Sequence, residues 1–276
     1  MKIKTSFPAL LLLFPFVVSA QSTAKEWYNK GIELKKKHDY PEALTAFKNA
    51  INKKPGYKDS YYQAGWCSNE LEKYEDAISF FEKYNPSSNT DNKNKYNELA
   101  YSYYKLQKSK ESIDACSKVI ALFPNNGMAL RGMGNVYYEL EQDFDKAIQY
   151  FEKALEVDEE ESKPIYYKLG WLYNDRERYD EAVKILLKAI EYDSEDPGYR
   201  EELGYAYYMQ EQYEFALAQL NKAITLDESS KLAYYYKGLC YIATSKKGDA
   251  MSMYYKLKEL EGEEATELLH KISKMK

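Results

Sequence analysis

The chain has 276 residues, a formal net charge of −5 and 30 tyrosines. Nucleic acids and anionic lipids draw much of their protein affinity from Lys and Arg, and a chain with no basic stripe argues against both kinds of ligand. With only 8 prolines and 12 glycines, long helices are allowed almost throughout the sequence.

The N-terminal segment has the pattern of an export signal. Met1 to Lys4 is short and positive, and Phe7 to Val18 is an apolar run. That run is shorter than the roughly 20 residues of a membrane-spanning helix. Small residues then precede Gln21, so we predict a signal peptide over 1–20 and a short lead over 21–23. An uncleaved anchor is the alternative.

This segment predicts an exported protein, periplasmic or secreted. The style of this signal peptide suggests a bacterial source. No second apolar run follows, so we expect no stable membrane span once the signal is cleaved.

A period of about 34 residues runs through the rest of the chain. One series holds small residues at Gly31, Gly65, Ala100, Gly134, Gly170, Gly204 and Gly238. A second series, mostly alanine, holds Ala43, Ala77, Ser112, Ala147, Ala182, Ala216 and Ala250. Four residues after each of these comes a generally bulkier one, at Phe47, Phe81, Cys116, Phe151, Leu186, Leu220 and Tyr254. A period of this length is the signature of a repeat architecture.

The clearest copy is 163–196, which predicts two amphipathic helices. Tyr166, Leu169, Gly170 and Tyr173 share one helical face, and Ala182, Leu186, Ala189 and Ile190 share another. A polar linker at 175–178 separates the two faces. A single copy would be an ordinary helical hairpin, but seven copies predict helix pairs that stack.

The pattern resembles the tetratricopeptide repeat (TPR) family, whose repeats carry Leu-Gly, Tyr, Ala and a second Ala in this order. Copy five matches with Leu169, Gly170, Tyr173, Ala182 and Ala189. The resemblance implies an all-α fold, an α-solenoid of stacked antiparallel helix pairs in a right-handed superhelix. The seven repeats are expected at about 24–57, 58–92, 93–126, 127–162, 163–196, 197–230 and 231–264.

Three copies depart from the family pattern. Copy three has Ala100, Ser112 and Cys116 at the three key positions, copy two ends irregularly at Asn85-Pro86, and copy four has an extra residue near Gln142. We expect a local bend near copies two to four.

Residues 263–276 predict a C-terminal capping helix. Ala265, Leu268, Leu269 and Ile272 form its apolar stripe. Terminal caps with a polar outer face keep a solenoid soluble.

Residues that carry chemistry are sparse. His38 and His270 lie far apart, with no metal-ligand spacing. The three cysteines, Cys67, Cys116 and Cys240, are best interpreted as small buried hydrophobes. No phosphate-binding loop or nucleophile elbow is present, so we predict a non-enzyme without catalytic residues, metal or cofactor.

In the family, the first helix of each repeat lines a concave groove. The resemblance places there Tyr62, Trp66, Asn97, Tyr101, Arg131, Asn135, Tyr138, Tyr167, Trp171, Asn174, Tyr205, Tyr208 and Tyr235. Rigid aromatic residues are frequent binding hot spots. The alternative is that these tyrosines reflect a Tyr-rich chain and pack between helices.

The basic clamp of chaperone-adaptor members is not expected here. Arg131, Asn135 and Lys168 could begin such a clamp, but Gly198 and Glu202 stand where basic residues belong.

The function predicted from the sequence is an exported interaction scaffold, with a protein or peptide partner of the cell envelope held in the groove. Two alternatives remain open at this point. The aromatic groove could instead bind carbohydrate or cell-wall glycan, or a second copy of the chain could fill it and make a homo-oligomer.

Overall fold

The computed structural model describes residues 22–275 and divides into two compact units, the first ending at Asn85 and the second beginning at Pro86. No strand occurs within 22–275. The predicted signal peptide lies outside the described residues, and it remains a prediction.

The first unit contains two helix pairs. They are α1 (Ala24–Lys36), α2 (Tyr40–Lys53), α3 (Lys58–Glu70) and α4 (Tyr74–Lys83), and each helix packs against the next. A capping box fixes the start of α1, because Thr23 Oγ1 accepts from the Glu26 amide at 3.2 Å and the Glu26 carboxylate accepts from the Thr23 amide at 2.7 Å.

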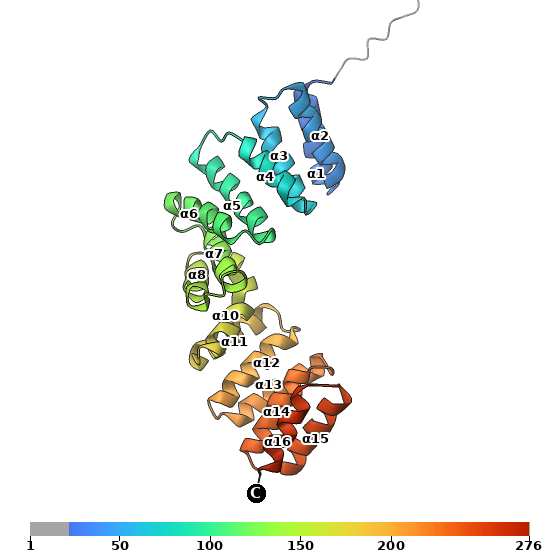
Figure 1. Cartoon of the computed structure of the whole chain (residues 1–276), viewed down its shortest axis with the longest axis vertical. Helices are drawn as coiled ribbons and strands as arrows, with labels where there is room; N and C mark the ends of the chain where they lie inside the picture. The colour runs from blue at the N-terminus through green and yellow to red at the C-terminus, as the bar shows by residue number, and fades with distance from the viewer. Residues whose placement is uncertain (1–21, 276) are drawn as a thin grey trace, which may run out of the picture. The chain divides into compact units, whose positions relative to one another are not determined.

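The second unit continues the same pattern (Figure 1). Its first helices are α5 (Asn89–Lys105), α7 (Gly127–Glu139), α10 (Tyr166–Asp175), α12 (Pro197–Met209) and α14 (Lys231–Ala243). Its second helices are α6 (Ser109–Leu122), α8 (Phe144–Val157), α11 (Tyr179–Tyr192), α13 (Tyr213–Leu226) and α15 (Lys247–Glu259), and α16 (Glu264–Ser273) follows them.

Stacking within the second unit follows the chain order. Each first helix packs on its own second helix, and neighbouring first helices also touch, as α10 does with α12 and α12 with α14. A short helix, α9 (Glu159–Ser162), and a 3₁₀ turn, η1 (Lys163–Ile165), precede α10. The predicted all-α solenoid of stacked helix pairs is confirmed.

The small residue of each first helix is where the two helices of a pair come closest. A Cβ added to Gly170 would lie 2.5 Å from Leu186 Cδ2, and one added to Gly204 would lie 2.6 Å from Leu220 Cγ. The same approach joins Gly31 to Phe47, Gly65 to Phe81 and Gly134 to Phe151. Glycine is therefore required by close helix packing at these positions, which offsets its low helix propensity.

Copy three has different residues at the small and bulky positions of this helix contact. Ala100 is larger than glycine, and the bulky position holds the smaller Cys116. Both residues are buried. The hydroxyl of Ser112 donates to the Ala100 carbonyl at 2.9 Å, so the polar substitution in this core is satisfied.

The capping helix α16 completes the last repeat. Leu268 contacts Gly238, where an added Cβ would lie 2.6 Å from Leu268 Cδ2. Leu268 therefore takes the place that the bulky residue of the same repeat has against the glycine in other repeats. Ala265, Leu268 and Ile272 are buried as predicted, but Leu269 is 38% exposed, so its assignment to the apolar stripe was wrong.

The interpretation of the three cysteines as core residues is confirmed. Cys67, Cys116 and Cys240 are all buried and unpaired. Burial raises the pKa of the Cys67 thiol to about 11 and that of the Cys116 and Cys240 thiols to about 12. The thiols are therefore neutral at physiological pH and serve as packing groups.

The turns between paired helices share an unusual backbone conformation. A non-glycine residue with φ between 53° and 61° occurs at His38, Glu72, Gln107, Gln142, Glu177, Glu211, Ser245 and Glu261. After α12, for example, the Gln212 amide donates to the Tyr207 carbonyl at 2.8 Å and closes the helix end. Each turn therefore places a side chain in the left-handed region that favours glycine.

Gly170→Ala is expected to destabilise the protein by about 1–3 kcal/mol, because the new methyl group overlaps Leu186 in a packed core. The measurement is the urea midpoint of unfolding. Gly248→Ala is the control, since an added Cβ there meets no atom within 4 Å. An equal loss in both variants would contradict the packing explanation.

Glu211→Gly is expected to stabilise the protein by about 0.5–1 kcal/mol. The left-handed conformation costs a non-glycine residue about 1–2 kcal/mol, which exceeds the entropic cost of glycine. The matched control is Ala218→Gly, an exposed position in the middle of α13, which should lose about 1 kcal/mol. Thermal unfolding of both variants distinguishes the two effects, and a loss in Glu211→Gly would refute the prediction.

Candidate functional site

Aromatic side chains from successive repeats meet in the second unit. Trp171 contacts Tyr138 edge-on, with ring centroids 5.9 Å apart, and Tyr205 contacts Tyr236 at 4.9 Å. Tyr167 lies beside Tyr199 of the next first helix, with centroids 6.0 Å apart. We call Tyr138, Tyr167, Trp171, Tyr205 and Tyr236 the aromatic band. These residues lie on α7, α10, α12 and α14.

A polar group borders the band on α7 and α10. Lys168 Nζ donates to Asn135 Oδ1 at 2.8 Å and to Glu139 Oε1 at 2.5 Å. The Tyr104 hydroxyl also donates to Glu139. Burial raises the pKa of Glu139, but the hydrogen bonds from Lys168 and Tyr104 outweigh it and leave that pKa below its usual value. Lys168 therefore already has partners within the chain.

The group formed by Asn174, Glu201 and Glu202 is the most buried polar part of the site. Asn174 is 4% exposed and Glu202 is 7% exposed. Asn174 Nδ2 donates to Glu202 Oε2 at 2.8 Å and to the Glu202 carbonyl at 3.0 Å. Burial raises the pKa of both carboxyls, although Asn174 donates to Glu202 and Ser230 donates to Glu201. Within 22–275, neither carboxylate is part of an ion pair with Lys or Arg.

Four tyrosines lie close enough to the Glu202 carboxylate for its charge to raise their pKa values. Burial, followed by the charge of Glu202, raises the pKa of Tyr167 to about 12 and strongly raises that of Tyr236. Burial also dominates for Tyr138 and Tyr205, with Glu202 contributing in both cases. All four phenols are therefore neutral hydrogen-bond donors at physiological pH.

The structure brings five of the predicted groove residues together at this place, namely Tyr138, Tyr167, Trp171, Asn174 and Tyr205. Asn135 is held at its border by Lys168.

Other predicted residues of the second unit have different surroundings. Tyr101 is 46% exposed, and the guanidinium of Arg131 donates to the Glu161 carbonyl. Tyr208 packs against Tyr213 at 5.9 Å, and Tyr235 lies beside Tyr236 at 5.7 Å. Asn97 has a buried Oδ1 without a hydrogen-bond partner.

Tyr62 and Trp66 belong to the first unit. Tyr62 is half-buried and contacts the buried rings of Phe81 at 5.8 Å and Tyr84 at 5.4 Å. Trp66 is half-buried under the ammonium of Lys35, which lies 3.5 Å from the ring centroid.

Reasoning from sequence missed Glu202 and Tyr236 as site residues. In the sequence, Glu202 stands out only because it breaks a basic clamp. Tyr236 sits in a run of three tyrosines, 234–236, next to the predicted Tyr235. Its one signal was that it belongs to the most tyrosine-dense stretch of a first helix.

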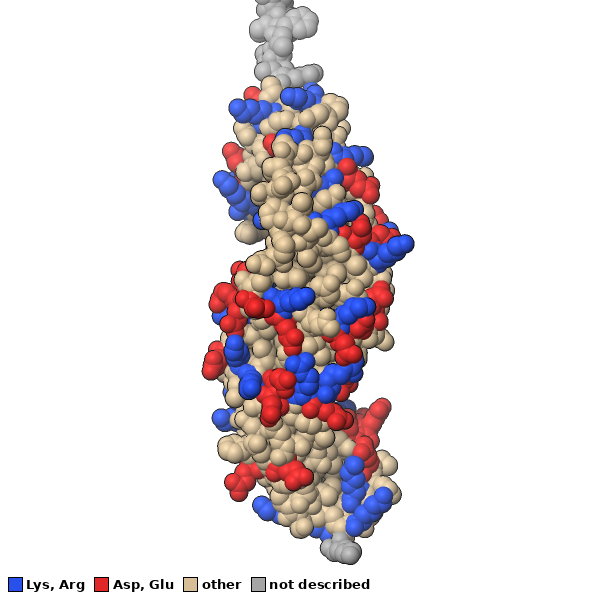
Figure 2. Space-filling model, turned by 90° about the vertical axis from the view of Figure 1, so that its left-hand side faces the viewer, with Lys and Arg blue, Asp and Glu red and all other residues tan. Residues whose placement is uncertain are grey.

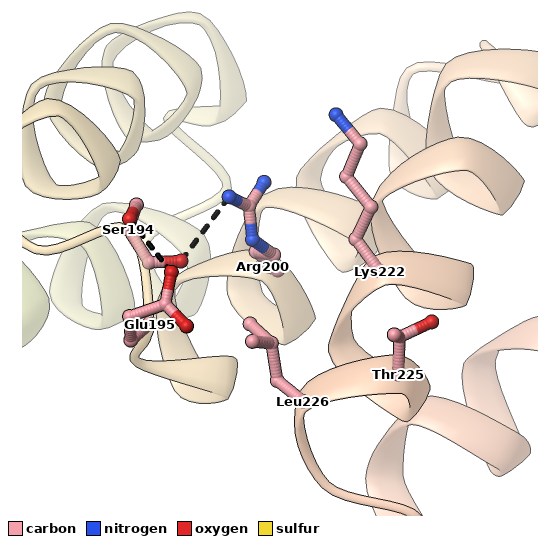
Figure 3. A pocket seen from close by; sticks show the side chains of 6 residues that line it. All are labelled: Ser194, Glu195, Arg200, Lys222, Thr225 and Leu226. Carbon is pink, nitrogen blue, oxygen red and sulfur yellow. Dashed lines mark hydrogen bonds between the residues drawn. The ribbon is translucent and has the colours of Figure 1, made fainter.

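A separate small hollow of about 170 Å³ lies between the start of α12 and α13. Its walls are Ser194, Glu195, Arg200, Lys222, Thr225 and Leu226 (Figure 3). Arg200 Nη2 donates to the Ser194 carbonyl at 3.2 Å, which fixes the guanidinium against the loop. The hollow has both acidic and basic walls and holds no aromatic residue.

Lys and Arg side chains are interspersed with Asp and Glu on the face drawn in Figure 2. Across 22–275, no group of three or more His, Cys, Asp or Glu side chains could hold a metal ion. In the same range, no helix is both long enough and apolar enough to cross a membrane.

Family models agree with this architecture. Models described as "Tetratricopeptide repeat" match residues 28–92, 93–160 and 140–201, and one described as "Anaphase-promoting complex, cyclosome, subunit 3" matches 175–257. The chain belongs to the tetratricopeptide repeat family, with about seven repeats. No curated protein matches its sequence.

Solved structures show the same fold. The C-terminal part of a TPR repeat-containing protein from Cytophaga hutchinsonii is 20% identical with a TM-score of 0.69, covering 88% of this chain and 99% of that one. YrrB, described as a TPR protein with an unusual peptide-binding site, is 21% identical with a TM-score of 0.52, covering 82% and 96%. A chain of the APC/C hetero-tetramer Cut9-Hcn1 is 18% identical with a TM-score of 0.58; the match covers 79% of this chain but spans only 42% of that one.

Glu202→Gln is expected to make the protein more stable at pH 7, with the gain disappearing near pH 4. Since burial raises the folded-state pKa of Glu202, its contribution to stability is present below the unfolded pKa of about 4.3 and is lost as pH rises through the folded pKa. Glutamine has no proton to lose and keeps an oxygen for Asn174.

The measurement is the urea midpoint of both proteins between pH 4 and 8. The control is Glu195→Gln, which removes the same charge at an exposed position in the wall of the hollow of Figure 3. A difference between wild type and Glu202→Gln that does not vary with pH would contradict the assignment.

Proposed function

We propose that this protein is an exported scaffold that binds an extended segment of a partner protein along the aromatic band. Binding of protein or peptide partners is the general role of TPR proteins. The observation that carries the finer proposal is the band itself, in which Tyr138, Trp171, Tyr167, Tyr205 and Tyr236 come from successive first helices.

The band has the properties of a hot-spot surface. Tyr and Trp provide a large contact area and lose little side-chain entropy on binding, since each has two torsions. Tyr167 remains 38% exposed, and Trp171 is half-buried. A partner chain would therefore cover apolar ring faces that are only partly covered in the free protein.

Polar groups beside the band suit a polypeptide ligand. The Asn174 amide has a buried oxygen, Oδ1, without a hydrogen-bond partner. A polypeptide carries N–H donors on its backbone and on its side chains, and one of them could satisfy this oxygen. The printed description of YrrB as a peptide-binding TPR protein supports the same ligand class.

Export is part of the proposal because of the segment 1–20, with its basic start, apolar run and small residues before Gln21. The partner is therefore expected among proteins of the bacterial envelope or its surroundings.

The double variant Tyr167→Ala/Trp171→Ala is expected to bind envelope-protein partners at least about 30-fold more weakly. Truncating a binding hot spot costs about 2 kcal/mol or more of binding free energy. The measurement is crosslinking and mass spectrometry in the native cell, followed by titration of the captured partner. Circular dichroism checks that the variant is folded.

The matched control is Leu187→Ala/Tyr192→Ala, which removes two exposed side chains of α11, at 42% and 50% exposure. Equal partner capture by both double variants would overturn the band as the binding surface. Binding on a glycan array, with no protein captured, would favour carbohydrate recognition instead.

A further inference from the structure

We propose that the carboxylates of Glu201 and Glu202 form a subsite for one basic side chain, lysine or arginine, of the bound partner segment. This inference rests on the proposed function, because the subsite lies within the aromatic band and is expected to be filled by the same ligand.

The first argument is the position of Glu202. It lies on α12, which packs against both α10 and α14. Asn174 of α10 donates to Glu202 Oε2, and the charge of Glu202 acts on Tyr138, Tyr167 and Tyr236 of α7, α10 and α14. Aromatic rings from several helices therefore lie around the Glu202 carboxylate.

The second argument is the missing countercharge. A buried carboxylate is costly unless it is paired or well hydrogen-bonded. Two basic residues on α10 and α12 have other partners: Lys168 binds Glu139, and Arg200 donates to the Ser194 carbonyl and to Gln219. Within 22–275, no cation forms an ion pair with Glu201 or Glu202.

The neighbouring charges add to the negative potential. The charges of Asp227 and Asp196 act on Glu201, and the charge of Glu201 acts on Glu202. The remaining groups that face the carboxylates are neutral: Asn174, Ser230 and the phenols of the band. The charges that act on these two carboxyls are therefore all negative.

The third argument is independent of charge. Asn174 is 4% exposed, and its Oδ1 is buried without a hydrogen-bond partner. The Nδ2 of the same amide donates to Glu202, so Oδ1 is an unused acceptor beside the carboxylate. A basic side chain carries three or five N–H donors and no acceptor, so it can satisfy the amide oxygen and the carboxylate together.

The aromatic walls suit the same ligand. An ammonium or guanidinium group over a Tyr or Trp ring gains about 0.5–2 kcal/mol, the larger value when the pair is desolvated. Tyr205 and Tyr236 lie 4.9 Å apart and both lie near Glu202. The subsite combines a carboxylate, an amide acceptor and ring faces, all of which favour a cation over a neutral or acidic side chain.

Binding at this subsite depends on pH in a defined direction. The ionised carboxylate binds the cation, and burial raises the pKa of Glu202 and Glu201 above the usual value. Affinity for a basic segment therefore falls as pH is lowered through this raised range, before ordinary exposed glutamates are protonated.

The test uses phage-displayed random 12-residue peptides selected on the wild-type protein, on Glu202→Gln and on the charge-matched control Glu195→Gln. We expect peptides selected by wild type and by Glu195→Gln to share one position held by Lys or Arg. Peptides selected by Glu202→Gln should keep aromatic and apolar residues but lose that basic position. The ratio of Lys to Arg at the position distinguishes an ammonium from a guanidinium ligand.

A selected peptide is then titrated by fluorescence anisotropy. Glu202→Gln in the protein and Lys→Gln or Arg→Gln in the peptide should each weaken binding by about tenfold or more, and together they should weaken it no further, as expected for two groups that interact directly. Wild-type affinity should also fall more steeply than that of Glu202→Gln as pH is lowered from 7 towards 4.

The outcomes separate the two proposals. Peptides that bind the band without any basic position, or that keep it in Glu202→Gln, overturn the cation subsite and leave the scaffold proposal standing. A wild-type protein that selects no peptide overturns both. Because Glu202→Gln is expected to be at least as stable as wild type at pH 7, lost selection cannot be attributed to unfolding.

Discussion

The close approach of two helices at one small residue per repeat is the constraint on which the rest of the structure depends. At Gly170 and Gly204 there is no room for even a methyl group against Leu186 and Leu220. A helix pair in contact at this distance still has one uncovered apolar face, and only another pair can cover it. Stacking follows from this packing, and α16 ends the second unit by placing Leu268 against Gly238.

Stacking also turns isolated side chains into a surface. Residues that recur once in each first helix lie far apart in the chain, yet they become neighbours because first helices pack side by side. Tyr138 and Trp171 are one repeat apart, as are Tyr205 and Tyr236, and both pairs are in ring contact. The regular core therefore supports an irregular surface, where each repeat is free to contribute a different group.

The candidate site contains buried polar residues, which are unusual in the core of a solenoid. Core positions of the repeats hold small and apolar residues, but Asn174 and Glu202 are as buried as many of them. A buried amide oxygen without a partner and a buried carboxylate without a cation both cost stability. Such a cost is typical of residues that serve binding rather than folding.

The sequence alone determined the helix pairs, the period and the small residues at close contacts, because these depend on local pattern and recur in every copy. It also predicted that Tyr138, Tyr167, Trp171, Asn174 and Tyr205 line one surface. Only the tertiary structure decided that Leu269 is exposed, that Tyr62 packs against Phe81 and that Glu202 is buried among tyrosines. The reason is that burial at those positions depends on which side chain a neighbouring helix places opposite, and Asn174 reaches Glu202 from 28 residues away.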